Sequence, residues 1–146
     1  MDSTRVDATP DRALIAANLP VREGEEPWTE EELMEVVADL KAEVIKHRES
    51  IEQSEAELRG LLHEGSDGAG RDPADVGSAN FERDQEMSLA ANAREMLEQT
   101  ELALRMIRIG SYGRCENCGE PIGKGRLLVY PRATMCLACK QRAERR

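Results

Sequence analysis

All four cysteines of this 146-residue chain lie in two short motifs near its C-terminal end. Two residues separate Cys115 from Cys118 and Cys136 from Cys139, and seventeen residues separate the two pairs. This spacing is typical of a four-cysteine zinc site, in which thiolates surround one tetrahedral ion at about 2.3 Å. Gly119 follows the first pair and can adopt the left-handed backbone that such a turn often needs. The sequence therefore predicts a bound Zn²⁺.

Two disulfide bonds, or four unrelated thiols, are the alternatives to a metal site. The N-terminal residues lack the charged and apolar regions of a signal peptide, and no apolar run reaches the eighteen or so residues that span a membrane. We expect a cytoplasmic protein with no membrane association, and a reducing compartment favours zinc over disulfides. A zinc ion bound by four thiolates has no open coordination position for a substrate. The sequence also contains no catalytic triad or phosphate loop. We therefore expect no enzymatic activity.

Charge divides the chain into an acidic arm and a basic end. Residues 1–109 hold 26 of the 29 acidic side chains, whereas residues 110–146 hold eight basic and three acidic ones. The acidic arm repels nucleic acid, and the basic end suits contact with nucleic acid or with an acidic protein surface. Aromatic residues make up only 3% of the chain and charged residues 34%, a balance that favours long exposed helices over a large packed core.

Residues 1–26 show no sustained period, and prolines interrupt them. We predict a disordered or loosely ordered acidic tail there, with a short helix around residues 11–18. A long helix is predicted to start at Thr29, which can cap it, with Glu32 completing a capping box. Trp28 and Leu33 then occupy the positions of a hydrophobic staple, so Trp28 is interpreted as structural.

Apolar residues keep a heptad from Leu33 to Leu61, which predicts a coiled coil. The predicted seam consists of Leu33, Val37, Leu40, Val44, His47, Ile51, Ser54, Leu58 and Leu61. His47 is interpreted as a packed residue because no second metal ligand lies at helical spacing from it. A second helix is predicted from about residue 80 to 109, ended by Gly110. Its predicted stripe consists of Leu89, Ala93, Met96, Leu97, Thr100, Ala103, Leu104 and Ile107.

Two helices of similar length, each roughly 45 Å, joined by a short connection form antiparallel neighbours. The predicted fold class is mainly all-α, with a long antiparallel coiled-coil helical hairpin over residues 27–109. Its tip loop is placed at about residues 63–79. Residues 110–146 are predicted to form a small four-cysteine zinc module with a short basic C-terminal helix.

The predicted zinc module of residues 110–146, called the finger below, carries a sequence pattern that extends beyond its four cysteines. The pattern comprises Ile109, Gly110, Ser111, Tyr112, Gly113, Cys115, Cys118, Gly119, Ile122, Arg126, Leu127, Pro131, Ala133, Cys136 and Cys139. It resembles the TraR/DksA-type zinc-finger family of bacterial transcription regulators. That family has an Asp-x-x-Asp-x-Ala motif at the tip of its coiled coil, and this chain has Asp72, Asp75 and, in place of the alanine, Gly77.

The resemblance implies a partner and a mechanism. Members of the family bind RNA polymerase without reading DNA sequence, and their coiled coil enters the secondary channel. Acidic tip residues act near the catalytic centre, while the finger and the C-terminal helix rest on the outside of the polymerase. Asp72 and Asp75 would be the tip acids here, in a monomeric protein. Some members also respond to guanosine tetraphosphate through basic residues, but the second helix is acidic around residues 95–101, so no alarmone site is predicted.

Other interpretations remain open from the residues alone. Asp72 and Pro73 also form a good helix start, in which Asp72 caps the helix and Pro73 takes its first position. The basic finger suggests a nucleic-acid-binding zinc-finger protein, although no helix beside the cysteines carries the cluster of side chains that reads base edges. A third hypothesis is a structural adaptor whose coiled coil pairs with another chain.

Overall fold

The computed structural model describes residues 11–66 and 73–145, with the side chains of residues 64–66 left out of the description. Within these ranges five helices follow one another: α1 (Arg12–Asn18), α2 (Glu30–Ser66), α3 (Pro73–Arg108), α4 (Lys124–Val129) and α5 (Leu137–Glu144). Over the described ranges the only β-type pairing is an isolated bridge between Arg114 and Pro121. The mainly all-α prediction is therefore confirmed.

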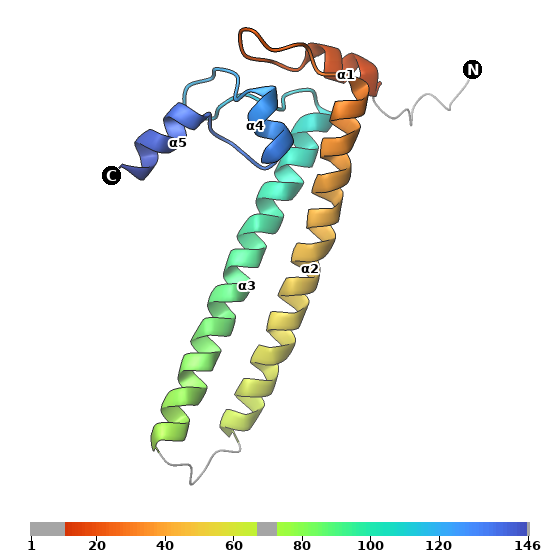
Figure 1. Ribbon diagram of the computed structural model, residues 1–146. Coiled ribbons are helices and arrows are strands. Elements are labelled where there is room, and N and C mark those ends of the chain that lie inside the picture. Colours follow the sequence, from red (N-terminus) through yellow and green to blue (C-terminus); the bar gives the residue numbers. More distant parts are fainter. Residues whose placement is uncertain (1–10, 67–72, 146) are drawn as a thin grey trace, which may run out of the picture. The chain divides into compact units, whose positions relative to one another are not determined.

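The long helices α2 and α3 run side by side in opposite directions as a helical hairpin (Figure 1). The chain divides into two compact units, one formed by residues 1–41 and 101–146 and the other by residues 42–100. The finger therefore shares a unit with the first turns of α2 and the last turns of α3.

Along the described residues, no helix combines the length and the apolar character that crossing a membrane requires.

The start of α2 has the predicted capping box. The Thr29 amide donates to Glu32 Oε1 at 3.0 Å, and the Glu32 amide donates to Thr29 Oγ1 at 3.1 Å. Three glutamates occupy the first turn of α2, where they complement the helix dipole. Trp28 and Leu33 are both buried, as the hydrophobic staple requires.

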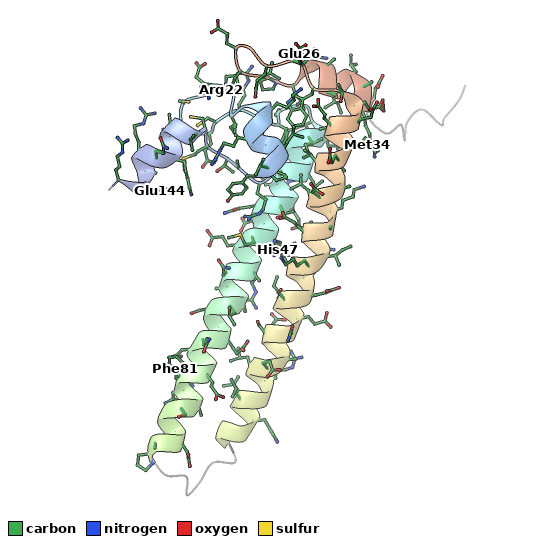
Figure 2. All side chains as sticks on the ribbon, viewed as in Figure 1. Arg22, Glu26, Met34, His47, Phe81 and Glu144 are labelled. Atoms are coloured by element: carbon green, nitrogen blue, oxygen red, sulfur yellow. The ribbon has the colours of Figure 1, made fainter. Side chains whose placement is uncertain are left out.

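The predicted heptad of α2 lies against α3. Leu33 and Leu40 are fully buried, and Ser54 is also buried. The other predicted seam residues are all half-buried: Val37, Val44, His47, Ile51, Leu58 and Leu61. Figure 2 shows His47 between the two helices, where it lines a hollow of about 410 Å³ with Ser54, Ala93 and Met96. His47 therefore packs on the seam, as predicted.

The stripe on α3 is shifted at one position. The buried residues of this stripe are Ala90, Ala93, Thr100, Ala103 and Ile107. Leu89, which was assigned to the stripe, is 51% exposed, and Ala90 takes its place. Ala90, Leu97 and Leu104 are seven residues apart and so share one face of α3. Leu89 is one position away from Ala90 and therefore points about 100° away from that face. Thr100 Oγ1 donates to the Met96 carbonyl at 2.7 Å, which satisfies this buried hydroxyl locally.

Both helices extend further than the sequence indicated. The tip loop was placed at about residues 63–79, yet α2 continues to Ser66 and α3 already begins at Pro73. Proline is favoured at the first helical position because its missing N–H would have no partner there. At the other end, α3 stops at Arg108, and Gly110 has a φ of 77°. The amide of Ser111 donates to the Met106 carbonyl at 2.8 Å, which closes the helix end as predicted for a glycine stop.

The prediction of a loosely ordered tail is wrong for residues 11–26, while residues 1–10 lie outside the described range. The expected short helix is present as α1, and Asp11 caps it by accepting from the Ala13 amide at 3.0 Å. Ala16 and Leu19 are buried in the same cluster as the finger's apolar residues. The prediction failed because these contacts join residues about a hundred positions apart, which no local pattern reveals.

Glu25 binds the N-terminal segment to the finger. Its Oε1 accepts from the Arg22 amide at 2.7 Å and from the Lys124 amide at 2.9 Å, and its Oε2 accepts from the Gly125 amide at 3.0 Å. Burial raises the pKa of Glu25, but the N–H groups of Gly125, Arg22 and Lys124 outweigh that effect and leave the pKa below its ordinary value. The carboxylate thus caps the first turn of α4 from a distant part of the chain.

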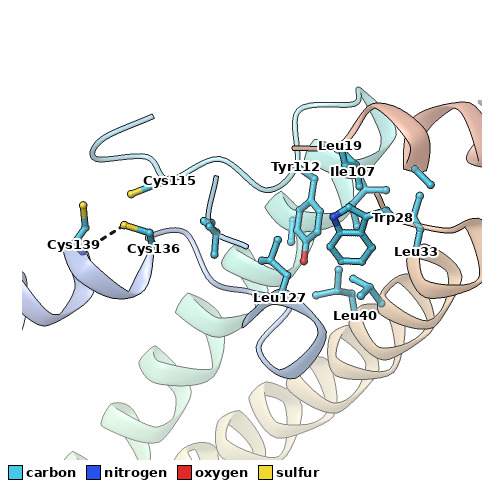
Figure 3. Packing of buried hydrophobic residues seen from close by; sticks show 14 residues of the cluster. Leu19, Trp28, Leu33, Leu40, Ile107, Tyr112, Cys115, Leu127, Cys136 and Cys139 are labelled. Atoms are coloured by element: carbon cyan, nitrogen blue, oxygen red, sulfur yellow. Dashed lines mark hydrogen bonds between the residues drawn. The ribbon is translucent and has the colours of Figure 1, made fainter. Parts of the chain in front are cut away.

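A shared aromatic pair lies beneath this contact. The rings of Trp28 and Tyr112 meet edge to face, with centroids 6.3 Å apart and planes at 62° (Figure 3). The Tyr112 hydroxyl donates to the Pro131 carbonyl at 2.7 Å, and burial raises the pKa of Tyr112. Leu127 of α4 is fully buried beside them. The start of α2, the segment that carries Tyr112 and α4 therefore share one hydrophobic core.

Replacing Glu25 by Gln should destabilise the unit that contains the finger. Glutamine cannot accept three amides as a carboxylate does, so we expect a loss of about 1 kcal/mol in the free energy of unfolding at pH 7. Since the folded-state pKa of Glu25 is lowered, its contribution is full above the unfolded value of about 4.3 and falls as the pH drops through the folded value. Urea denaturation of both proteins at pH 7 and pH 3 measures this.

The exposed Glu23, in the same turn, offers the control Glu23→Gln. This variant should unfold at the wild-type urea concentration at both pH values. Equal destabilisation by Glu23→Gln and Glu25→Gln would show that general charge, and not the three amide contacts, is responsible.

Candidate metal centre

Each pair of cysteines forms a short turn, called a knuckle here. The first knuckle, which holds Cys115 and Cys118, is stabilised by hydrogen bonds of its own backbone. The Cys115 amide donates to the Glu120 carbonyl at 2.8 Å, and the Gly119 amide donates to the Cys115 carbonyl at 2.9 Å. Gly119 has a φ of 77°, the left-handed conformation expected for it from the sequence. The Glu116 amide donates to the Thr134 carbonyl at 2.8 Å, so the first knuckle is attached to the segment that leads into the second.

The second knuckle is the start of a helix. Cys136 is the N-cap of α5, and its Sγ accepts from the Cys139 amide at 3.5 Å. Cys139 therefore lies in the first turn of α5, where the free amides of a helix carry a partial positive charge. This position suits thiolate sulfurs, because the helix end stabilises negative charge.

The structure brings the four cysteine sulfurs together. All four Sγ atoms lie within 4.8 Å of one another, and those of Cys118 and Cys136 are 3.9 Å apart. Four sulfurs at about 2.3 Å from a tetrahedral ion would be about 3.8 Å apart, so the cluster fits one such ion. Cys115, Cys136 and Cys139, which are labelled in Figure 3, are buried. Cys118 is exposed, and all four are free thiols.

The thiols influence one another's ionisation. Burial raises the pKa of Cys115, but the backbone N–H groups of Cys136, Cys118 and Asn117 outweigh this and lower it to about 6. The Glu120 amide lowers the pKa of Cys118, yet burial and contacts with the other three cysteines raise it to about 11. Four neighbouring thiolates repel one another, so a cation is needed before all can ionise together. The donor set thus forms a metal-binding site for a thiophilic divalent ion.

Two polar side chains support the cluster from outside. The Asn117 side-chain amide donates to Cys139 Sγ at 3.3 Å, and the Arg142 guanidinium donates to the same atom at 3.2 Å. Both donors lower the pKa of Cys139, the contact from Asn117 being the larger cause. The sequence interpretation missed them, although Arg142 follows Cys139 by three positions on a helix, a spacing at which side chains meet.

The predicted tip residues belong to a different compact unit from the cysteines. Asp75 is exposed in the first turn of α3. Gly77 is exposed within α3, and nothing lies within 4 Å of the position that a Cβ atom would occupy. Asp72, together with its predicted capping role, lies outside the described residues.

Comparison with known proteins agrees with the cysteine geometry. Residues 110–145 match the family described as the prokaryotic dksA/traR C4-type zinc finger. The RNA polymerase-binding transcription factor DksA of Caulobacter vibrioides is 41% identical over 75 residues, which cover 51% of this chain and 53% of that protein. DksA of Escherichia coli K12 is 33% identical over 73 residues, covering 50% and 48% respectively. The chain thus spans about half the length of the curated relatives it matches.

A solved structure extends the likeness beyond the finger. Transcription factor DksA2 from Pseudomonas aeruginosa superposes with a TM-score of 0.64 and 27% sequence identity, over 99% of this chain and 97% of that one. The finger match, the relatives and the helical hairpin agree with one another. Residues 110–145 are therefore similar to the prokaryotic dksA/traR C4-type zinc finger, and the chain as a whole has the fold of DksA2.

Proposed function

We propose that this protein is a zinc-containing transcription regulator that binds RNA polymerase. The observation that carries the proposal is the agreement between the finger match and the printed function of the relatives, which are RNA polymerase-binding transcription factors. The hairpin, shared with DksA2 over nearly the whole of both chains, supports it. The regulator acts in the cytoplasm, as a monomer and without enzymatic activity of its own.

Zinc is the metal that best suits the four cysteines. Four thiolates with mutual distances below 4.8 Å match a closed tetrahedral site, which holds an ion for structure and offers no position for substrate. Cys115, Cys118, Cys136 and Cys139 hold it, and the ion supplies folding free energy to a module with little core of its own. The residues of the chain position the sulfurs through the knuckle amides and the first turn of α5.

The hairpin tip is the part that acts on the polymerase. We assign this role to Asp72 and Asp75, with the tip inserted into the secondary channel. Asp75 is exposed in the first turn of α3. The first turn of a helix stabilises a carboxylate and presents it in a fixed direction. An exposed acidic side chain in the first turn of a helix suits action near a metal-dependent active centre.

Metal analysis tests the zinc site. We expect one zinc ion per chain by mass spectrometry of the purified protein, and its loss in Cys139→Ser. Because thiolates must be deprotonated to bind, lowering the pH releases the ion. Chelation should increase amide hydrogen exchange in residues 110–145 and leave the helices of residues 42–100 protected. Zinc content that survives the serine substitution would contradict the four-cysteine assignment.

A tip variant tests the mechanism. Asp72→Asn/Asp75→Asn should bind core RNA polymerase with an affinity within about twofold of the wild type, because only two side chains of the proposed contact surface are changed. Its effect on promoter-complex lifetime in a purified transcription assay should be lost. The control Glu49→Gln/Glu52→Gln removes the same charge from exposed positions on α2 and should keep the effect. Failure of the wild type to bind polymerase would refute the proposal.

Alanine at position 77 tests the departure from the family tip motif. Gly77 lies within α3, so Gly77→Ala should stabilise the helix by about 0.5–1 kcal/mol, seen as a higher melting temperature. Gly60→Ala on α2, where a Cβ also meets nothing within 4 Å, should stabilise equally. We expect only Gly77→Ala to strengthen the effect on transcription. Equal effects from both variants would show that helix stability alone matters.

A further inference from the structure

Cys139 has a different environment from the other three cysteines. Its sulfur accepts from two side chains, with Arg142 Nη2 at 3.2 Å and Asn117 Nδ2 at 3.3 Å. The two donors come from opposite knuckles, because Asn117 lies between the first two cysteines and Arg142 lies on α5.

Charge gives the Arg142 contact its importance. Four thiolates around one divalent ion carry a net charge of about −2, and a guanidinium in direct contact offsets part of it. Hydrogen bonds to ligand atoms also hold the ligand in the orientation that the metal needs. Arg142 and Asn117 can therefore stabilise the thiolate of Cys139 by hydrogen bonds, as backbone amides stabilise the thiolate of Cys115.

The helix that carries Arg142 has almost nothing else to hold it. Helix α5 has eight residues, and Cys139 is its only buried one. A helix of this length is marginal in water without tertiary contacts. Leu137, at its start, is 52% exposed, so apolar packing contributes little. The attachment of α5 thus depends on Cys136 at its N-cap, Cys139 in its first turn and the reach of Arg142 back to that sulfur.

We propose that Arg142, assisted by Asn117, couples the folding of α5 to the charge of the metal centre. The contact slows the release of the ion, and the ion in turn keeps α5 folded and attached. Coupling of this kind is reciprocal, so weakening either side weakens the other by the same free energy. Arg142 is a positioning residue here, since it touches a ligand atom and not the ion. The proposal rests on the zinc assignment made above.

Zinc release from the full-length protein tests the coupling. We would mix the zinc-loaded chain with excess chelator and follow released zinc with the dye 4-(2-pyridylazo)resorcinol. Arg142→Gln should release zinc about tenfold faster than the wild type, the lower end of the range for supporting residues of a metal site. Asn117→Ala should show a smaller increase. Arg142→Lys keeps the charge without the planar fork of the guanidinium. Its rate of zinc release should therefore fall between those of the wild type and Arg142→Gln.

Arg145→Gln is the matched control. Arg145 carries the same charge at the end of the same helix, and it is exposed with no sulfur contact. Its release rate should equal that of the wild type. Hydrogen exchange measured by mass spectrometry supplies a second readout, in which Arg142→Gln should raise exchange in residues 137–144 while zinc is still bound.

The outcomes separate this proposal from the one on which it rests. A zinc-loaded protein in which Arg142→Gln and Arg145→Gln both release zinc at the wild-type rate would refute the coupling and leave the zinc site intact. Equal acceleration by the two variants would also refute it, because general charge would then suffice. A purified chain without zinc would instead overturn the metal assignment. Faster release confined to the Arg142 and Asn117 variants, with greater exchange in α5, supports the coupling.

Discussion

The finger depends on a hydrophobic core that it shares with the ends of the long helices. Ile122 and Leu127 of the finger belong to the same buried cluster as Leu33 and Leu40 of α2 and Ile107 of α3. A module of under forty residues seldom buries enough apolar area to fold by itself. The shared core therefore supplies apolar burial that the finger lacks by itself, since the cysteines lie on one side of the cluster and the helix ends on the other.

Local chemistry in the sequence was sufficient for the elements whose signals are short-range. The capping box at Thr29 and Glu32, the glycine stop at Gly110 and the left-handed Gly119 each depend on neighbours within a few positions. The four cysteine sulfurs also meet as their spacing indicated. The capping and turn features can be read from residue types because their partners lie within one or two turns of each other, and the cysteine cluster because its paired spacing is typical of a metal site.

Other features escaped because their partners are distant or because the pattern was ambiguous. The Glu25 contacts reach residues about a hundred positions away, and the surrounding prolines and charges resemble those of an unstructured tail. On α3, Leu89 and Ala90 both fitted an apolar stripe, and only the packing against α2 selected the smaller residue. At the hairpin end, Gly65 and Gly77 suggested a wider loop, although a glycine lowers helix stability by only about 1 kcal/mol.

The attachment of Glu25 to the amide of Lys124 has a consequence for the order in which the protein forms. The two residues are 99 positions apart, so the partner of Glu25 does not yet exist when the N-terminal segment leaves the ribosome. At about 5–20 residues per second, synthesis delays this contact by roughly 5–20 seconds. The apolar side chains of Ala16, Leu19 and Trp28 wait for the same partners. During that interval the surface that these side chains share with Tyr112, Ile122 and Leu127 stays exposed, and it becomes buried only after those residues are made.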